Sequence, residues 1–399
     1  MQATRISLTR TTIAISALLV GAAIAAPASA ATLSVGAGKT YATPCKAFAA
    51  AKTGDVIDIQ AATYSGDVCT IYASNLTIRG VNGRPKIDAA GKSAQGKAIW
   101  VVAGNNINIS NVEMYGAKVA DRNGAALRLE GTNFTLRNSF LHDNENGILS
   151  GQNLSSTITL ESNEFGHNGY GDGYSHNVYI GKVAKLYYRY NFSHDAHVGH
   201  NLKTRAVYNL ITYSRFSSLR AGETGSTAAG KPSYEIDVPN AGTTYIVGNV
   251  IMQPSSHNNP TLIAYGEEGA INGKDDLYIV NNTFLNEDAS RGYFVMVGSG
   301  VVTPAKLTNN LFSGTGTQST QTKAVLTTNF QSLAPSFVNR AAYDLRPLVN
   351  PLITNAGSVP GYALDGLNLK AVYSYKHTAS ASARGILGTK TDIGAYEVQ

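Results

Sequence analysis

A short frame recurs along the chain, and this repeat constrains the fold more than any other feature. Each instance is a β-rich run, then an asparagine, then an apolar residue, as in FTLRNSF, ITLESNEF and LYIVNNTF. The steps between instances are 23 to 35 residues long. A unit of this size cannot bury a hydrophobic face alone, so the units must stack. The frame positions are Asn111, Asn138, Asn163, Asn191, Ser214, Asn249, Asn282 and Asn310.

The stack is predicted to be an all-β, right-handed parallel β-helix. Short strands with polar turns, 40 glycines and no strong helical pattern favour this solenoid, and the repeated asparagine can form a side-chain ladder along it. A propeller would need about 40 to 45 residues per blade. We expect one domain over residues 31–399. It comprises an N-terminal cap over 31–72 with a short helix from Pro44 to Ala51, coils over 73–334 and a closing segment over 335–399.

The first thirty residues have the pattern of a signal peptide. Arg5 and Arg10 make a basic start, residues 13–26 are an apolar run, and the sequence Ala28-Ser29-Ala30 suits cleavage. The run is too short to span a bilayer, and no later segment resembles a membrane helix. We therefore expect a secreted or periplasmic protein. Its two cysteines, Cys45 and Cys69, are expected to form a disulfide in that environment.

A second family of strands lies between the frames and has aliphatic residues at alternate positions. Alternation then directs the intervening side chains outward, and the stack brings them onto one shallow face. Such a face suits an extended polymer. The expected outward residues are Arg128, Glu130, Tyr179, Lys203, Arg205, Glu235 and Asp237, followed in continued register by Tyr265 and Glu267.

Four of the eight histidines fall within residues 175–220, in a chain that is otherwise poor in charge. Such a cluster is a candidate chemical site. In HDAHVGH, the spacing of His194, His197 and His200 would suit a metal on a helix, but Gly199 and the repeat place them in a turn. Catalysis, substrate binding and turn hydrogen bonding remain open for them. His176 and His200 each begin a strand before an asparagine, so we expect them to stack on successive coils.

Metal binding is not assigned from the sequence. Carboxylates at 195, 223, 235, 237, 267 and 268 leave Ca²⁺ open as a cofactor, but no DxDxDG-type loop occurs. No phosphate loop or nucleic-acid motif is present either, so we expect no nucleic-acid partner.

The two ends of residues 31–399 resemble those of a known superfamily. The opening VGAGKTY…AFAAAKTGDVIDI…ATY and the closing YDLRPLVNPLITNAG and TDIGAYE are similar to the caps of pectate-lyase-like, right-handed parallel β-helix proteins. This resemblance implies the fold. It does not select an activity, because the scaffold carries lyases, hydrolases, epimerases, esterases and non-catalytic proteins.

A local resemblance concerns NLKTRAVYNLITYSRFSSLRAG, which is partly similar to the chondroitinase-B and alginate-lyase family. That family has a lysine on one coil, as the base at C5, and an arginine on the next. The resemblance implies these roles for Lys203 and Arg220.

The leading hypothesis is a lyase that cleaves an acidic polysaccharide by β-elimination, in a chain expected to be monomeric. Lys203 would be the base, Arg220 and Arg205 would bind the carboxylate, and His200, His197 or Tyr179 would be the acid. The remaining substrate contacts would come from Arg128, His176, Glu235, Asp237, Tyr265 and Glu267.

Three alternatives stay open. A glycoside hydrolase would use Glu235 and Asp237, which lie about 6.5–7 Å apart by strand rise. A non-catalytic surface or polysaccharide-binding protein would use the same face. Finally, Lys203 and Arg205 would only form ion pairs with Glu235 and Asp237 on the next coil.

Overall fold

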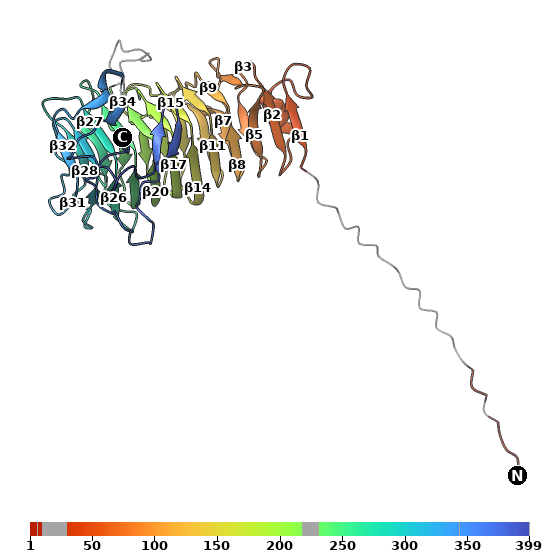
Figure 1. The fold of residues 1–399 in the computed structure, drawn as a ribbon. Helices are drawn as coiled ribbons and strands as arrows, with labels where there is room; N and C mark the ends of the chain where they lie inside the picture. Colours follow the sequence, from red (N-terminus) through yellow and green to blue (C-terminus); the bar gives the residue numbers. More distant parts are fainter. Residues whose placement is uncertain (6, 10–29, 218–230, 343, 399) are drawn as a thin grey trace.

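Three long parallel sheets wind into one solenoid in the computed structural model, which describes residues 1–5, 7–9, 30–217, 231–342 and 344–398 (Figure 1). We name them sheets A, B and C. Sheet A contains, in order, β1 (Thr32–Val35), β2 (Val56–Gln60), β5 (Thr77–Val81), β8 (Ile107–Ser110), β11 (Phe134–Arg137), β14 (Asn153–Glu161), β17 (Val183–Arg189), β20 (Tyr208–Thr212), β23 (Thr243–Val247), β26 (Leu277–Val280), β29 (Lys306–Thr308) and β31 (Val325–Thr327).

Sheets B and C complete each coil. Sheet B contains β3 (Thr63–Ser65), β6 (Lys86–Asp88), β9 (Glu113–Tyr115), β12 (Phe140–His142), β15 (Glu164–Gly166), β18 (Phe192–His194), β21 (Arg215–Ser217), β24 (Val250–Gln253), β27 (Thr283–Asn286), β30 (Leu311–Ser313) and β32 (Phe330–Ser332). Sheet C contains β4 (Cys69–Ile71), β7 (Ala98–Val102), β10 (Ala125–Leu129), β13 (Asn146–Ser150), β16 (Val178–Ile180), β19 (Leu202–Thr204), β22 (Ile236–Val238), β25 (Thr261–Tyr265) and β28 (Tyr293–Val297).

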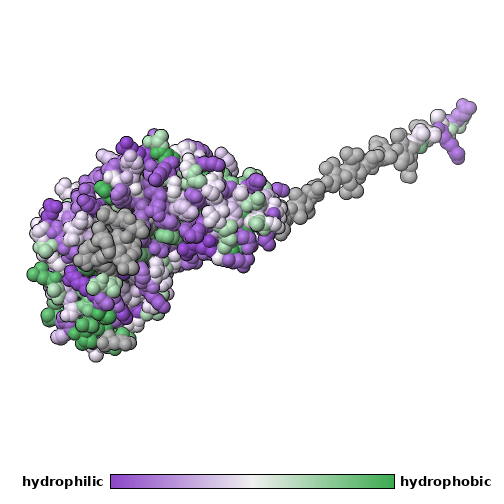
Figure 2. All heavy atoms as spheres, turned by 90° about the horizontal axis from the view of Figure 1, so that it is seen from above, coloured by the Kyte–Doolittle hydropathy of each residue, from purple (hydrophilic) through white to green (hydrophobic). Residues whose placement is uncertain are grey.

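The core lies inside the coils because each strand aligns its aliphatic positions with those of its neighbours. In sheet C, for example, Leu127 pairs with Ile148, and Ile148 pairs with Val178. All three are fully buried. The face seen from above is mainly hydrophilic, with apolar residues in scattered patches (Figure 2). The predicted all-β parallel β-helix is therefore confirmed.

The predicted ladder of amides is confirmed, with a correction to its first two members. Asn163 donates from Nδ2 to Asn191 Oδ1 at 3.1 Å, and Asn249 does the same to Asn282. In the first coils, however, the inward position belongs to Val112 and Ser139, one residue after the predicted slot. Asn111 and Asn138 have φ of 56° and 50°. Asparagine suits both the left-handed turn position and the inward position after it, so the sequence frame merged the two.

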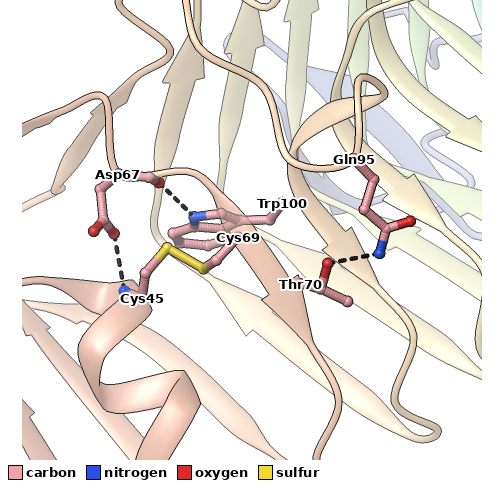
Figure 3. Close-up of a disulfide and its surroundings, with 6 residues drawn as sticks. All are labelled: Cys45, Asp67, Cys69, Thr70, Gln95 and Trp100. Carbon is pink, nitrogen blue, oxygen red and sulfur yellow. Dashed lines mark hydrogen bonds between the residues drawn. A yellow bond between two sulfur atoms is a disulfide. The ribbon is translucent and has the colours of Figure 1, made fainter.

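The predicted N-terminal cap contains α1 (Pro44–Ala50), whose Pro44 stands in the first turn. Phe48 of this helix meets the Trp100 ring edge-on, with centroids 5.0 Å apart. The predicted disulfide joins Cys45 in α1 to Cys69 in β4, next to Trp100 (Figure 3). It ties the cap to the first strand of sheet C.

The C-terminal segment contains the antiparallel pairs β33 (Phe337–Asn339) with β34 (Asp344–Pro347) and β35 (Tyr373–Lys376) with β36 (Ser380–Ala383), and a 3₁₀ turn η1 (Arg340–Ala342). Part of it folds back along the solenoid instead of lying across its end (Figure 1). Backbone N–H groups at Leu364 and Val372 donate to the hydroxyls of Tyr278 and Tyr213 on sheet A. This packing covers part of the outer surface of sheet A.

Candidate active site

Three successive strands of sheet C align the residues singled out in the sequence. Tyr179 in β16 pairs with Lys203 in β19, which pairs with Asp237 in β22. The residues on either side of Lys203, Leu202 and Thr204, are fully buried. Alternation therefore directs Lys203 to the outer face, as the sequence predicts.

Lys203 and Arg205 together hold one carboxylate. Lys203 Nζ lies 3.1 Å from Glu268 Oε1, and Arg205 Nη2 lies 2.7 Å from Glu268 Oε2. Desolvation alone would raise the pKa of Glu268, but the hydrogen bond from Arg205 and the charge of Lys203 lower it overall. The Glu268 side chain is 47% exposed, whereas that of Lys203 is 13% exposed. The two cations thus form a ready-made carboxylate site at the surface.

The guanidinium of Arg205 is held in one orientation by two further partners. Its Nε donates to the Tyr179 hydroxyl at 2.9 Å, and its Nη1 donates to Asn240 Oδ1 at 2.6 Å. These two bonds fix the plane of the guanidinium, and its third nitrogen, Nη2, is the one that faces Glu268. The sequence had not indicated Asn240, and it had placed Glu268 only among candidate metal ligands.

His176 and His200 stack on successive coils, as predicted, with ring centroids 4.5 Å apart. The backbone N–H of His200 donates to His176 Nδ1 at 3.0 Å, and that of Tyr234 donates to His200 Nδ1 at 3.2 Å. Each ring therefore carries its proton on Nε2. Burial first, and then the nearby Lys203 and Arg205, lower the pKa of His176 to about 3. Both rings are neutral donors, because the pKa of His200 is also lowered by burial and by His176.

Asp237 is the buried acid of the cluster. Its Oδ2 lies 3.1 Å from Lys203 Nζ and 3.5 Å from His200 Nε2. Desolvation raises the pKa of Asp237 to about 6, against the opposing effect of Lys203. The expected ion pair between this aspartate and the lysine is therefore present, and the aspartate can exchange a proton near neutral pH.

Two residues expected on this face point inward instead. Tyr265 is fully buried and donates its hydroxyl to Gly242 O at 2.7 Å. It pairs with Val238, so Ala264 is the neighbour of Asp237, and the extended register was wrong by one residue. Glu235 precedes the first residue of β22 and still belongs to the turn, so alternation within the strand does not apply to it.

Glu235 ends a second amide ladder inside the coils, which the sequence analysis missed. Asn177 donates to Asn201 Oδ1 at 2.7 Å, and Asn201 donates to Glu235 Oε2 at 2.5 Å. Asn168 precedes Asn177 in the same chain of contacts. The His-Asn pairs SHN and GHN were its only visible signal. Since Glu235 is interior, the pair of Glu235 and Asp237 expected for a hydrolase does not form on the outer face.

Glu235 is expected to make stability fall as pH rises from 6 to 8. Burial raises the pKa of Glu235 from its ordinary value to about 8. In this window the native state holds a proton that the unfolded chain has lost, so unfolding becomes easier by about 1 kcal/mol per pH unit. Urea unfolding of the wild type and Glu235→Gln at both pH values measures the effect. The variant should lose this slope, and equal slopes would contradict the interior protonated acid.

The other predicted residues lie apart from the cluster. Arg128 is in the same outward column, but the strand that carries Leu149 separates it from Tyr179, and its nearest carboxylate, at 3.8 Å, is Glu130. His197 is exposed in the turn, and Glu267 is exposed beside Glu268. Arg220 and Glu223 lie outside the described residues.

The described residues offer one group with metal-ligand geometry, formed by His167, His194 and Asp195 on sheet B. Two imidazoles and one carboxylate do not fit Ca²⁺, which takes six to eight oxygen ligands. Within the described chain, no helix is both long and apolar enough to cross a bilayer.

Known structures share the architecture. No protein-family model matches the chain, and no curated protein gives a significant match. A pectate lyase, Pel9A, matches with a TM-score of 0.63 and 15% identity over 92% of this chain and 96% of its own. An alginate lyase from Paenibacillus sp. str. FPU-7 has a TM-score of 0.45, with 16% identity over 74% of this chain and 97% of its own. The likeness to the pectate lyase is one of fold. The chain has the right-handed parallel β-helix fold of the pectate-lyase-like proteins.

Proposed function

We propose that this protein is a lyase that cleaves an acidic polysaccharide at a uronate by β-elimination. The observation that carries the proposal is that Lys203 and Arg205 form ion pairs with the two oxygens of the exposed Glu268 carboxylate. A uronate carboxylate has the same two oxygens and would replace that of Glu268. The shared fold with a pectate lyase accords with this substrate class.

β-Elimination needs the uronate charge to be neutralised, a base for the proton on C5, and an acid for the leaving oxygen. Arg205 supplies the first, because an oriented guanidinium binds a carboxylate strongly. Lys203 is the proposed base. The ammonium must lose its proton before it can act as a base, and Asp237 Oδ2, 3.1 Å from its Nζ, is a carboxylate within hydrogen-bond reach through which that proton would leave.

Tyr179 is the proposed acid. Its hydroxyl accepts a hydrogen bond from Arg205, so a positive charge faces the oxygen that would give up its proton. His200 is a positioning residue in this scheme, since its Nε2 lies beside Asp237 and its Nδ1 is already bound to backbone. His197 is exposed in the turn and is not part of this scheme.

Secretion is part of the proposal. The leader pattern of residues 1–30 and the Cys45–Cys69 disulfide support it, since disulfides persist in oxidising compartments. Residues 10–29 of that leader lie outside the described residues.

The product decides the reaction class. The purified protein is incubated with alginate, with pectate and with a glucuronate-containing polymer, and ultraviolet absorbance is followed together with new reducing ends. Methyl-esterified pectin, which lacks the free carboxylate, is the matched control. A lyase gives an absorbing unsaturated product on an acidic polymer and little on the ester. New reducing ends without absorbance would instead indicate a hydrolase, and binding without products a non-catalytic protein.

A further inference from the structure

A Glu–His–Asp arrangement occurs twice on the outer face of sheet B, away from the proposed active site. In the later copy, His194 Nδ1 lies 2.8 Å from Asp195 Oδ2, and His194 Nε2 lies 3.3 Å from Glu164 Oε1. The earlier copy is formed by His142 with Asp143 and Glu113, at 2.5 and 3.4 Å. Each imidazole therefore has a carboxylate at both nitrogens.

Among the described residues, only the later copy has a third ligand close enough to complete a metal group. His167 occupies a turn position in its coil, with φ of 56°, and Asp195 occupies the equivalent position in the next coil, with φ of 51°. The backbone N–H of His167 donates to His194 O. The rings of His167 and His194 meet edge-on at 5.1 Å. The Nδ1 atom of His167 is buried and has no hydrogen-bond partner among the described residues. In the tautomer that carries its proton on Nε2, this Nδ1 has a lone pair that accepts no hydrogen bond from the described residues and can bind a metal.

Gly166 leaves the space that the His194 ring occupies. A Cβ atom at Gly166 would come within 2.5 Å of His194 Nε2, so a larger residue would displace this ring. One ligand atom each from His167, His194 and Asp195 lies within 4.8 Å of the other two. A zinc ion with ligand bonds of about 2.0–2.2 Å would fit after small side-chain rotations.

We propose that His167, His194 and Asp195 form a site for a borderline divalent transition metal of the Zn²⁺ type. Imidazole nitrogen is a ligand that suits zinc, copper and nickel, whereas Ca²⁺ is bound by oxygen ligands. Glu164 is the outer carboxylate that orients a ligating imidazole. On binding, the metal replaces the proton shared between His194 and Asp195, which is released to solvent. Asp195 begins the turn that leads into β19, so the ion would tie sheet B to the strand that carries Lys203.

The test is calorimetric titration of tag-free, chelator-treated protein with ZnCl₂ and, separately, with CaCl₂. The wild type should bind one Zn²⁺ per protein molecule, with no comparable binding of Ca²⁺. His167→Ala should weaken the zinc affinity at least about 10- to 100-fold. This variant removes an imidazole whose Nδ1 makes no hydrogen bond, and circular dichroism checks its fold; His167→Gln is the second variant, with the same expectation.

His142→Ala is the matched control, because His142 has the same kind of carboxylate partners but belongs to no group with metal-ligand geometry among the described residues. It should leave the zinc affinity unchanged. Absence of stoichiometric Zn²⁺ binding in the wild type would overturn the proposal. So would unchanged affinity in both His167 variants, or an equal loss in His142→Ala, since the ion would then lie elsewhere. Co²⁺ absorbance provides an independent reading of nitrogen ligation.

Discussion

Replacing Lys203 by arginine is expected to lower kcat on the acidic polymer by about 10³-fold while leaving KM within a few-fold. Arginine keeps the positive charge that binds the uronate carboxylate, but its guanidinium does not give up a proton at working pH. The variant therefore separates the base from the carboxylate binder, and a positioned base contributes about 10²- to 10⁴-fold. Steady-state kinetics by ultraviolet absorbance measures both constants.

Lys203→Gln and Lys185→Gln complete this experiment. Glutamine removes both the base and the charge, so KM should rise as kcat falls. It also leaves Asp237 without its cation, but this buried acid, whose pKa is already raised to about 6, takes up a proton rather than remain an unpaired charge. Lys185 is an exposed lysine in β17 of sheet A and should tolerate the change. Retention of wild-type kcat by Lys203→Arg would show that another group is the base.

Asn177→Ala is expected to cause the largest loss of stability, lowering the free energy of unfolding by about 4 kcal/mol. Asn177 Oδ1 accepts from Asn168, and its Nδ2 donates to Ser193 Oγ, His194 O and Asn201 Oδ1. Alanine leaves several of these buried groups without a partner, at about 1–3 kcal/mol each.

Urea unfolding of Asn177→Ala beside Asn108→Ala measures this effect. Asn108 is exposed in β8, so its replacement should change stability by no more than about 0.5 kcal/mol. A loss below about 1 kcal/mol for Asn177→Ala would mean that water takes over the hydrogen bonds of the Asn177 side chain. The interior amide ladder would then contribute little to the stability of the fold.

The fold was predictable because its signal is repeated. Each coil carries the same strand and turn pattern, so a local error at Asn111 or Asn138 does not change the conclusion. Orientation was predictable within strands, as at Lys203, where Leu202 and Thr204 on either side both point inward. It failed at the strand boundary, as at Glu235, because alternation holds only inside the pleated strand.

The site was less predictable because its partners come from loops and backbone. Glu268 lies 65 residues from Lys203 along the chain, in a turn whose path no periodicity defines. The tautomer of His176 depends on a backbone N–H that donates to its Nδ1, which the sequence does not display. The return of the C-terminal segment along sheet A likewise depends on Tyr213 and Tyr278 finding distant backbone donors.

The most direct measurement is a crystal structure of Tyr179→Phe with an oligouronate bound. This variant lacks the proposed acid but keeps both cations, so the substrate should remain intact. We expect one sugar carboxylate between Lys203 and Arg205, with the Glu268 side chain displaced into solvent and C5 facing Lys203 Nζ. An oligosaccharide bound on another face, with Glu268 still paired to both cations, would contradict it.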